Sequence, residues 1–174
     1  SNTMTGCSHK ANSGGEGGSG DSDFFLVELN NEIPANYGVY MSGWDRSNIG
    51  ATSGVSIHHP SGDRKKISTY SSALINSSIG NVGSHWKVYW VSTETNHGVT
   101  EGGSSGSSIY NQNHHIVGTL SSGASACVNG GAGAGTGPYA PDYYGKMSYH
   151  WDGSNPIPEQ DKLKYFLDPT GTGV

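Results

Sequence analysis

Length, composition and charge already exclude several classes of protein. The chain has 174 residues with 28 Gly, 10 Tyr and 4 Trp, and only 32% are hydrophobic, which predicts a loop-rich, all-β chain of one domain or slightly more. A net charge of −5 with only 9 Lys and Arg argues against nucleic acid and anionic membranes as partners, and no apolar run approaches the roughly 18 residues of a membrane-spanning helix.

The N-terminal part is polar and glycine-rich. The run SGGEGGSGDS at residues 13–22 predicts a flexible surface loop. No signal peptide is present, and the chain begins in what reads as mid-domain sequence, so we expect a processed or truncated N-terminus. Richness in Ser, Thr, Asn, Gly and Tyr suits a secreted protein. Cys7 and Cys127 fit either one disulfide or two bonds to cysteines outside the chain.

Two strands are predicted next. Residues 23–29, DFFLVEL, are apolar and β-prone. The acid that opens this run, Asp23, either caps the end of the strand or serves chemistry, with Asp21 in the loop as the near alternative. A second strand is predicted over residues 37–44, where Trp44 is assigned to packing.

Alternation of apolar and polar residues predicts further strands at residues 55–60 and 85–90. Neighbouring side chains of a strand point to opposite faces, so His58 and His59 cannot readily share a metal ion. The basic cluster at residues 64–66 is interpreted as a solvated turn or strand edge.

Residues 100–110, TEGGSSGSSIY, hold the strongest candidate for chemistry. A turn of small residues can bring one hydroxyl and exposed N–H groups close to a reacting carbonyl, whereas large side chains would block the approach. Ser105 is therefore the candidate nucleophile. A Gly–Ser string is otherwise typical of a flexible linker, but strand-like segments on both sides favour a fixed turn.

The C-terminal third contains one predicted helix. Acidic residues precede apolar positions at i, i+3 and i+4 within residues 158–169, and a proline ends the segment. Residues 130–137 form a second Gly/Ala-rich stretch, which is interpreted as a surface loop.

Several of these segments together resemble one protease family. GVTEGGSSGSSIY, SDFFLVELN, SIHHPSGDRKKIS and FLDPTGTG are similar to segments of bacterial lysyl endopeptidases, which are trypsin-like serine proteases. The resemblance covers about residues 20–174. It implies a chymotrypsin-like double β-barrel, with the end of the first barrel at residues 1–36. The second barrel and a short C-terminal helix would then occupy residues 37–174.

The resemblance also implies roles in a catalytic triad. Ser105 would attack the substrate carbonyl, and the N–H groups of Gly103 and Ser105 would form the oxyanion hole. Asp23 would accept a hydrogen bond from the Nδ1–H of a catalytic histidine.

Substrate recognition is implied for the segments that follow. Asp142 lies in PDYYGKM, which resembles the family segment at the base of the specificity pocket, so it would bind a lysine ammonium; its alternative role is to cap a Pro–Asp turn. Ser121 and Gly123 would contact the substrate backbone by strand addition. The family carries a histidine where this chain has Ser121, which puts the details of subsite binding in doubt.

The triad histidine is missing from its expected place. Only His9 precedes Asp23, in GCSHKA, which is not the family's histidine motif. The sequence therefore predicts the Ser- and Asp-bearing part of a lysyl endopeptidase, inactive without a companion N-terminal segment and needing neither cofactor nor metal. A non-catalytic protein derived from the protease fold and a carbohydrate-binding β-module are the alternatives.

Overall fold

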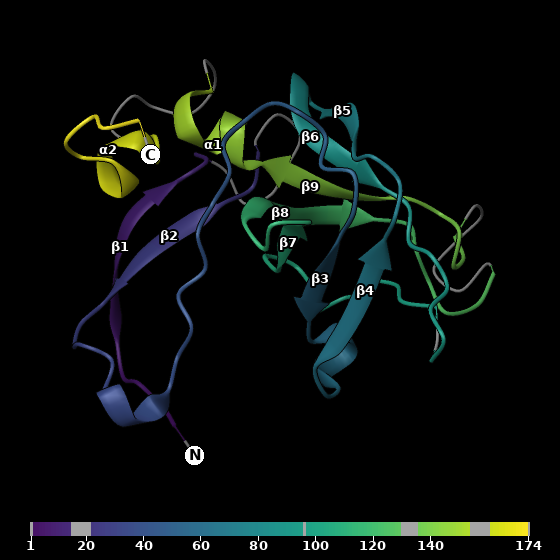
Figure 1. Cartoon of the computed structure of the whole chain (residues 1–174), viewed down its shortest axis with the longest axis horizontal. Coiled ribbons are helices and arrows are strands. Elements are labelled where there is room, and N and C mark those ends of the chain that lie inside the picture. The colour runs from purple at the N-terminus through teal and green to yellow at the C-terminus, as the bar shows by residue number, and fades with distance from the viewer. Residues whose placement is uncertain (1, 15–21, 96, 130–135, 154–160, 174) are drawn as a thin grey trace.

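The chain folds into two antiparallel β-sheets with short helices beside them, which confirms the all-β prediction (Figure 1). The computed structural model describes residues 2–14, 22–95, 97–129, 136–153 and 161–173. Within these ranges the helices are too short and too polar to cross a bilayer.

The smaller sheet is a hairpin of β1 (Cys7–Asn12) and β2 (Phe25–Leu29). One face of β2 packs toward the C-terminal helices through Leu26. The alternate side chains on its other face are apolar and exposed: Phe25 (67%), Val27 (39%) and Leu29 (40%). The sequence predicted a strand from Asp23, but β2 begins two residues later. No strand was predicted at β1.

The larger sheet has seven strands in the order β4-β3-β7-β8-β9-β6-β5. In chain order they are β3 (Gly54–His58), β4 (Lys66–Tyr70), β5 (Ile75–Ile79), β6 (Asn81–Val88), β7 (Ser108–Asn111), β8 (Ile116–Gly123) and β9 (Asp142–Lys146). The predicted strands at residues 55–60 and 85–90 correspond to β3 and to part of β6.

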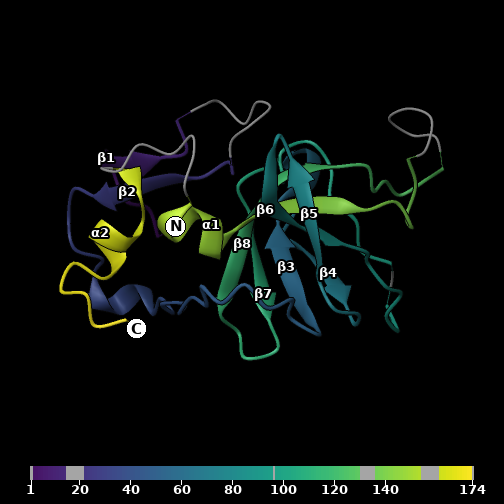
Figure 2. The ribbon, with the colours of Figure 1, turned by 90° about the horizontal axis from the view of Figure 1, so that it is seen from above.

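The larger sheet curls around its own core (Figures 1 and 2). Buried side chains from β4, β6, β7, β8 and β9 gather in one cluster, which includes Tyr70, Trp86, Ile109, Leu120 and Tyr144. Strands that lie several positions apart in a flat sheet could not share one cluster, so the curvature follows from the packing. The sheet is thus the curled second half of a chymotrypsin-like fold.

Four short helices are described. They are η1 (Ala35–Tyr37), η2 (Pro60–Gly62) in the connection from β3 to β4, α1 (Met147–Asp152) and α2 (Lys164–Leu167), and α1 lies between the two sheets (Figures 1 and 2). Met147 and Trp151 of α1 form a second core cluster with Ala11, Phe24 and Leu163. This cluster joins the hairpin to the larger sheet.

One local prediction was wrong. Residues 37–44 form no strand; η1 ends at Tyr37, and Trp44 makes only an isolated bridge to Ile116. The predicted short C-terminal helix is confirmed by α2, which spans four of the expected residues 158–169, and residues 158–160 lie outside the described ranges. The predicted loops at 13–22 and 130–137 lie largely outside the described residues.

The two cysteines do not form the disulfide that the sequence allowed. Both thiols are free and exposed. Cys7 lies on β1 in the smaller sheet, whereas Cys127 follows β8, a strand of the larger sheet.

Gly145 is the point where β9 touches the segment before the hairpin strand β2. A Cβ atom at this position would overlap the carbonyl oxygen of Ser22 and crowd Nε2 of His150. Replacing Gly145 with alanine is therefore expected to lower the free energy of unfolding by about 3 kcal/mol. Urea denaturation measures the loss. Gly102→Ala, where the added Cβ meets open space, is the matched control, and equal stability of the two variants would contradict the prediction.

Candidate active site

The glycine–serine turn, defined here as residues 101–107, is ordered by backbone hydrogen bonds. Ser104 N–H donates to Glu101 O (3.0 Å) and Ser107 N–H donates to Ser104 O (3.1 Å). Gly103 and Gly106 have φ angles of 92° and 78°, which favour glycine. A flexible linker would lack this pattern. Residues 98–100, which precede the turn and were predicted to be strand-like, form no strand. They are held by the hydrogen bonds of Thr100 to Ser125 and Asp142.

Ser105 is exposed at the tip of the turn, while Ser104 beside it is 1% exposed. The N–H of Gly106 donates to Leu120 O (2.9 Å), which ties the turn to β8. Among the described residues, no acceptor pairs with the N–H groups of Gly103 or Ser105. Two free donors on either side of a buried residue are what an oxyanion hole requires.

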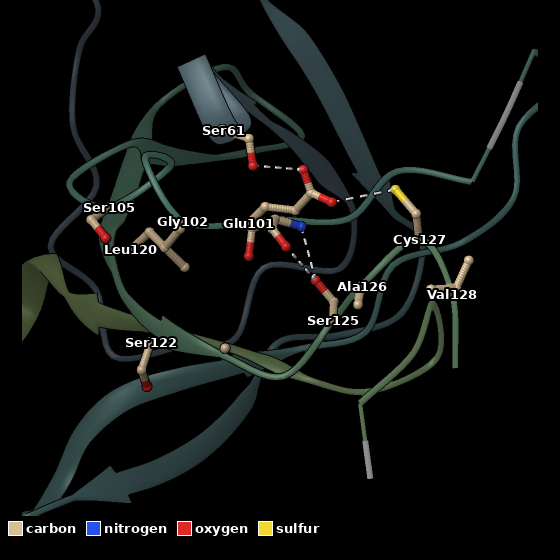
Figure 3. A pocket seen from close by; sticks show the side chains of 12 residues that line it. Ser61, Glu101, Gly102, Ser105, Leu120, Ser122, Ser125, Ala126, Cys127 and Val128 are labelled. Carbon is tan, nitrogen blue, oxygen red and sulfur yellow. Dashed lines mark hydrogen bonds between the residues drawn. The ribbon is translucent and has the colours of Figure 1, made fainter. Parts of the chain in front are cut away.

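A pocket of about 620 Å³ opens beside Ser105 (Figure 3). Thr100 and Ser125 line its inner wall, and Gly123 lines it from the end of β8. Glu101 lies at the rim, where it accepts a hydrogen bond from Ser61 Oγ (3.2 Å) and contacts Cys127 Sγ (3.6 Å).

Asp142 lies directly behind the inner wall of this pocket and is completely buried. Its Oδ2 accepts hydrogen bonds from Trp90 Nε1 (2.6 Å), Thr100 Oγ1 (2.7 Å) and Ser125 Oγ (2.6 Å). Its Oδ1 accepts from Ser125 N–H (3.0 Å). A Cβ at Gly123 would overlap Oδ1, so glycine is needed for the carboxylate to lie here. Four hydrogen bonds from three residues therefore satisfy the buried carboxylate.

The end of β8 leaves one edge of its backbone open. β7 pairs with β8 only as far as Ser108, opposite Thr119, whereas β8 continues to Gly123. The register with β9 shifts between Leu120 and Ser122, so Ser121 sits at a bulge. An extended chain could therefore add to this edge beside the pocket.

Asp23 lies on another side of the glycine–serine turn. Asp23 and Gly106 line the same largely apolar cavity of about 390 Å³ between the two sheets. The Asp23 carbonyl accepts a hydrogen bond from Thr119 Oγ1 (2.9 Å), and the Ser22 carbonyl accepts one from His150 Nε2 (2.9 Å). Asp23 has a φ of 61°, which is uncommon outside glycine and persists where the surroundings enforce it.

None of the eight histidines, all of which are described, hydrogen-bonds to Ser105. His58 instead contacts the residue next to Ser105, with its Nδ1 2.9 Å from Oγ of the buried Ser104. From the sequence, His58 and His59 were considered as ligands of a shared metal ion. His58 is 2% exposed and His59 is exposed, as expected for opposite faces. No sequence signal indicated the contact with Ser104.

The arrangement combines several features that an acyl-transfer site can use. The exposed hydroxyl of Ser105 belongs to a turn with two N–H groups that have no acceptor among the described residues, and a pocket with a buried carboxylate behind it opens beside that hydroxyl. An open strand edge adjoins the pocket, and the backbone of Asp23 is fixed near the turn. Within the described ranges, no histidine is hydrogen-bonded to the Ser105 hydroxyl to act as its general base.

A curled β-sheet that carries this turn and this pocket is the architecture of the second half of a trypsin-like serine protease. Residues 2–145 match the family described as "Lysyl endopeptidase, C-terminal domain". Because the match spans most of the chain, the chain belongs to this family of protease-derived domains.

Proposed function

We propose that this chain is the serine-bearing part of a secreted lysyl endopeptidase, which cleaves after lysine through an acyl-enzyme. Ser105 Oγ attacks the carbonyl carbon of the lysine residue, and the N–H groups of Gly103 and Ser105 hold the oxyanion. The histidine that takes the serine proton later protonates the leaving amine, and water then releases the acyl group by the same route. The observation that carries this proposal is the exposed Ser105 at the mouth of a pocket backed by a buried carboxylate.

The substrate lysine enters the pocket with its ammonium toward Asp142. Thr100 and Ser125 line the pocket and donate to this carboxylate, so they connect its charge with the substrate cation. Ser121 and Gly123 bind the substrate backbone along the open edge of β8. A neutral side chain would leave the buried charge without a cation and is disfavoured.

The catalytic histidine comes from a companion segment of the first barrel, and Asp23 accepts its Nδ1–H. The exposed apolar face of β2 supports this partner, because Phe25, Val27 and Leu29 offer the side chains of a barrel interior. Completion of the barrel would cover this face and bring an imidazole between Asp23 and Ser105.

Fluorophosphonate labelling of the native material tests the proposal. We expect one adduct, at Ser105, in material that also contains the histidine-bearing segment, and intact mass spectrometry distinguishes a segment joined to this chain from a separate polypeptide. The separated chain is expected to react roughly 10⁶-fold more slowly, because the general base is absent. Ser105→Ala should abolish labelling, whereas Ser61→Ala, another hydroxyl that lines the pocket, should not.

Absence of label in folded native material would contradict the proposal. It would favour a non-catalytic protein derived from the protease fold, which is the second candidate because no histidine of this chain contacts Ser105. The search would then turn from substrates to binding partners.

A further inference from the structure

A line of buried polar side chains runs from the glycine–serine turn into the larger sheet. Nδ1 of His58 lies 2.9 Å from Ser104 Oγ, and Nε2 lies 3.0 Å from Ser68 Oγ. Ser68 Oγ donates in turn to the carbonyl oxygen of Val99 (3.0 Å). The side chains of Ser104, His58 and Ser68 are all at most 2% exposed. Water therefore cannot replace these bonds, and each must be supplied by a protein partner.

One tautomer of the neutral His58 ring gives every hydrogen along this line an acceptor. The N–H of Glu101 donates to Ser104 Oγ (3.3 Å), which leaves the Ser104 hydroxyl hydrogen for Nδ1 of His58. The proton of the neutral ring then lies on Nε2 and is donated to Ser68, whose own hydrogen goes to Val99 O. This is the only tautomer in which every hydrogen of the line meets an acceptor.

We infer that His58 is a positioning residue for the glycine–serine turn, acting through Ser104 on the backbone that carries the N–H groups of Gly103 and Ser105. The inference rests on the proposed role of Ser105. Ser104 is the residue between the two free donors, so a shift of its side chain moves both of them. Gly103 is also held from the other side, because Ser61 N–H donates to Gly102 O (2.6 Å). The turn is therefore fixed between η2 and the His58 line.

Protonation would break this arrangement. A second proton on His58 would turn Nδ1 from an acceptor into a donor, so the hydroxyl hydrogen of Ser104 would lose its acceptor. Burial lowers the pKa of His58 and so protects the neutral form, and the nearby His59 acts in the same direction. The negative charges of Asp142 on β9 and of Glu101 raise the pKa and partly oppose burial.

Acylation rates of variants in the native assembly test the role. His58→Leu and Ser104→Ala are each expected to slow acylation of Ser105 roughly 10²-fold, the loss typical of one oxyanion donor. The double variant should be no slower than either single one, because both remove the same contact. Binding of n-butylamine to the pocket should be unchanged. His59→Gln, at the exposed neighbour, is the control.

The conservative variant gives a signature that a merely structural role would not give. A glutamine at position 58 can accept from Ser104 and donate to Ser68, but it does not titrate. His58→Gln should therefore recover most of the rate, and it should lose the part of the acid limb of the pH–rate profile that belongs to His58. Wild-type rates in His58→Leu, additive losses in the double variant or an unchanged acid limb in His58→Gln would each overturn the inference.

A nuclear magnetic resonance measurement separates this inference from the proposed function. In the full chain, the ring ¹⁵N shifts of His58 should report the neutral Nε2–H tautomer. The amides of Gly103, Ser104 and Ser105 should shift together as His58 titrates, and Ser104→Ala should uncouple them. If native material is not labelled but this coupling is observed, the proposed function fails and the positioning role stands. Titration of His58 without movement of these amides overturns it.

Discussion

Replacing Asp142 with asparagine is expected to remove the preference for lysine, lowering kcat/KM for a lysyl ester relative to its norleucyl analogue by roughly 10⁴-fold. Labelling of Ser105 should stay within about threefold of the wild-type rate. The physical reason is burial. Asp142 is fully buried, so its charge is poorly screened, and a lysine ammonium supplies the positive charge that the pocket lacks.

The asparagine variant is preferred to alanine because of the groups around the carboxylate. Trp90 Nε1 and Thr100 Oγ1 both donate to Asp142 and would lose this acceptor in an alanine variant, whereas Ser125 Oγ could still donate to the carbonyl oxygen of Thr100 (3.4 Å). Each unsatisfied buried donor costs about 1–3 kcal/mol, so alanine would confuse loss of folding with loss of recognition. Asparagine keeps an acceptor oxygen and the same volume.

Glu101→Gln is the matched control for the charge change. Glu101 also borders the pocket, but it lies at the rim and is only partly buried. Solvent screens a rim charge, so the preference for lysine should fall by less than about tenfold. Equal losses in the two variants would contradict a recognition role specific to Asp142. If the Asp142→Asn variant kept its preference for lysine, Asp142 would not be the residue that recognises the lysine ammonium.

The turn of residues 101–107 was predictable because its signal is local. Consecutive small residues are required wherever a backbone must approach another group closely, and the structure places such a turn beside the pocket. The surroundings of Asp142 were not predictable. Its partners Trp90, Thr100 and Ser125 come from separate segments, and only the curled sheet brings them to one carboxylate.

The fold shows the same division between local and long-range signals. β3 and part of β6 were predicted because alternation of apolar and polar residues marks them in the sequence. β1 has the sequence CSHKAN, which carries no apolar alternation, and it is a strand because it pairs with β2. α1 is six residues long and has no side-chain cap, so tertiary packing of Met147 and Trp151 is what stabilises it.

The contact of His58 with Ser104 could not be predicted from the residue types alone. Two adjacent histidines suggest a metal or a base, and nothing in the sequence SIHHP distinguishes the buried one by its partner. The contact with Ser104 joins residues 46 positions apart. Such a pairing depends on the register of β3 against β4 and on the path of the turn, neither of which local patterns determine.

The second large effect expected is a loss of stability in acid. His85 and His150 are both buried, at 0% and 1% exposure. Burial, together with the positive charge of Lys146, lowers the pKa of His85 to about 4. Burial also lowers the pKa of His150 to about 4, although its bond to the Ser22 carbonyl opposes the shift. Both rings are therefore neutral in the folded chain where they would be charged in the unfolded one.

The direction in which stability changes with pH follows from the number of protons that each state binds. Below the ordinary histidine pKa of 6.5 the unfolded chain binds two protons that the folded chain does not, so stability is fully present above pH 6.5 and falls as the pH is lowered. Each histidine contributes about 1.4 kcal/mol per pH unit, or about 3 kcal/mol by pH 4. The total of about 6 kcal/mol is comparable to the whole stability of many domains, so unfolding is expected near pH 4.

Urea denaturation at a series of pH values measures this effect. His150→Gln, which can still donate to the Ser22 carbonyl, should reduce the slope of stability against pH by about 1.4 kcal/mol per unit below pH 6.5. His115→Gln, at an exposed histidine, should leave the slope unchanged. A slope that stays the same in His150→Gln would mean that the buried ring is already charged in the folded state. Its Nε2–H could still donate to Ser22 then, but burial and the neighbouring His85 both disfavour a charge on this ring.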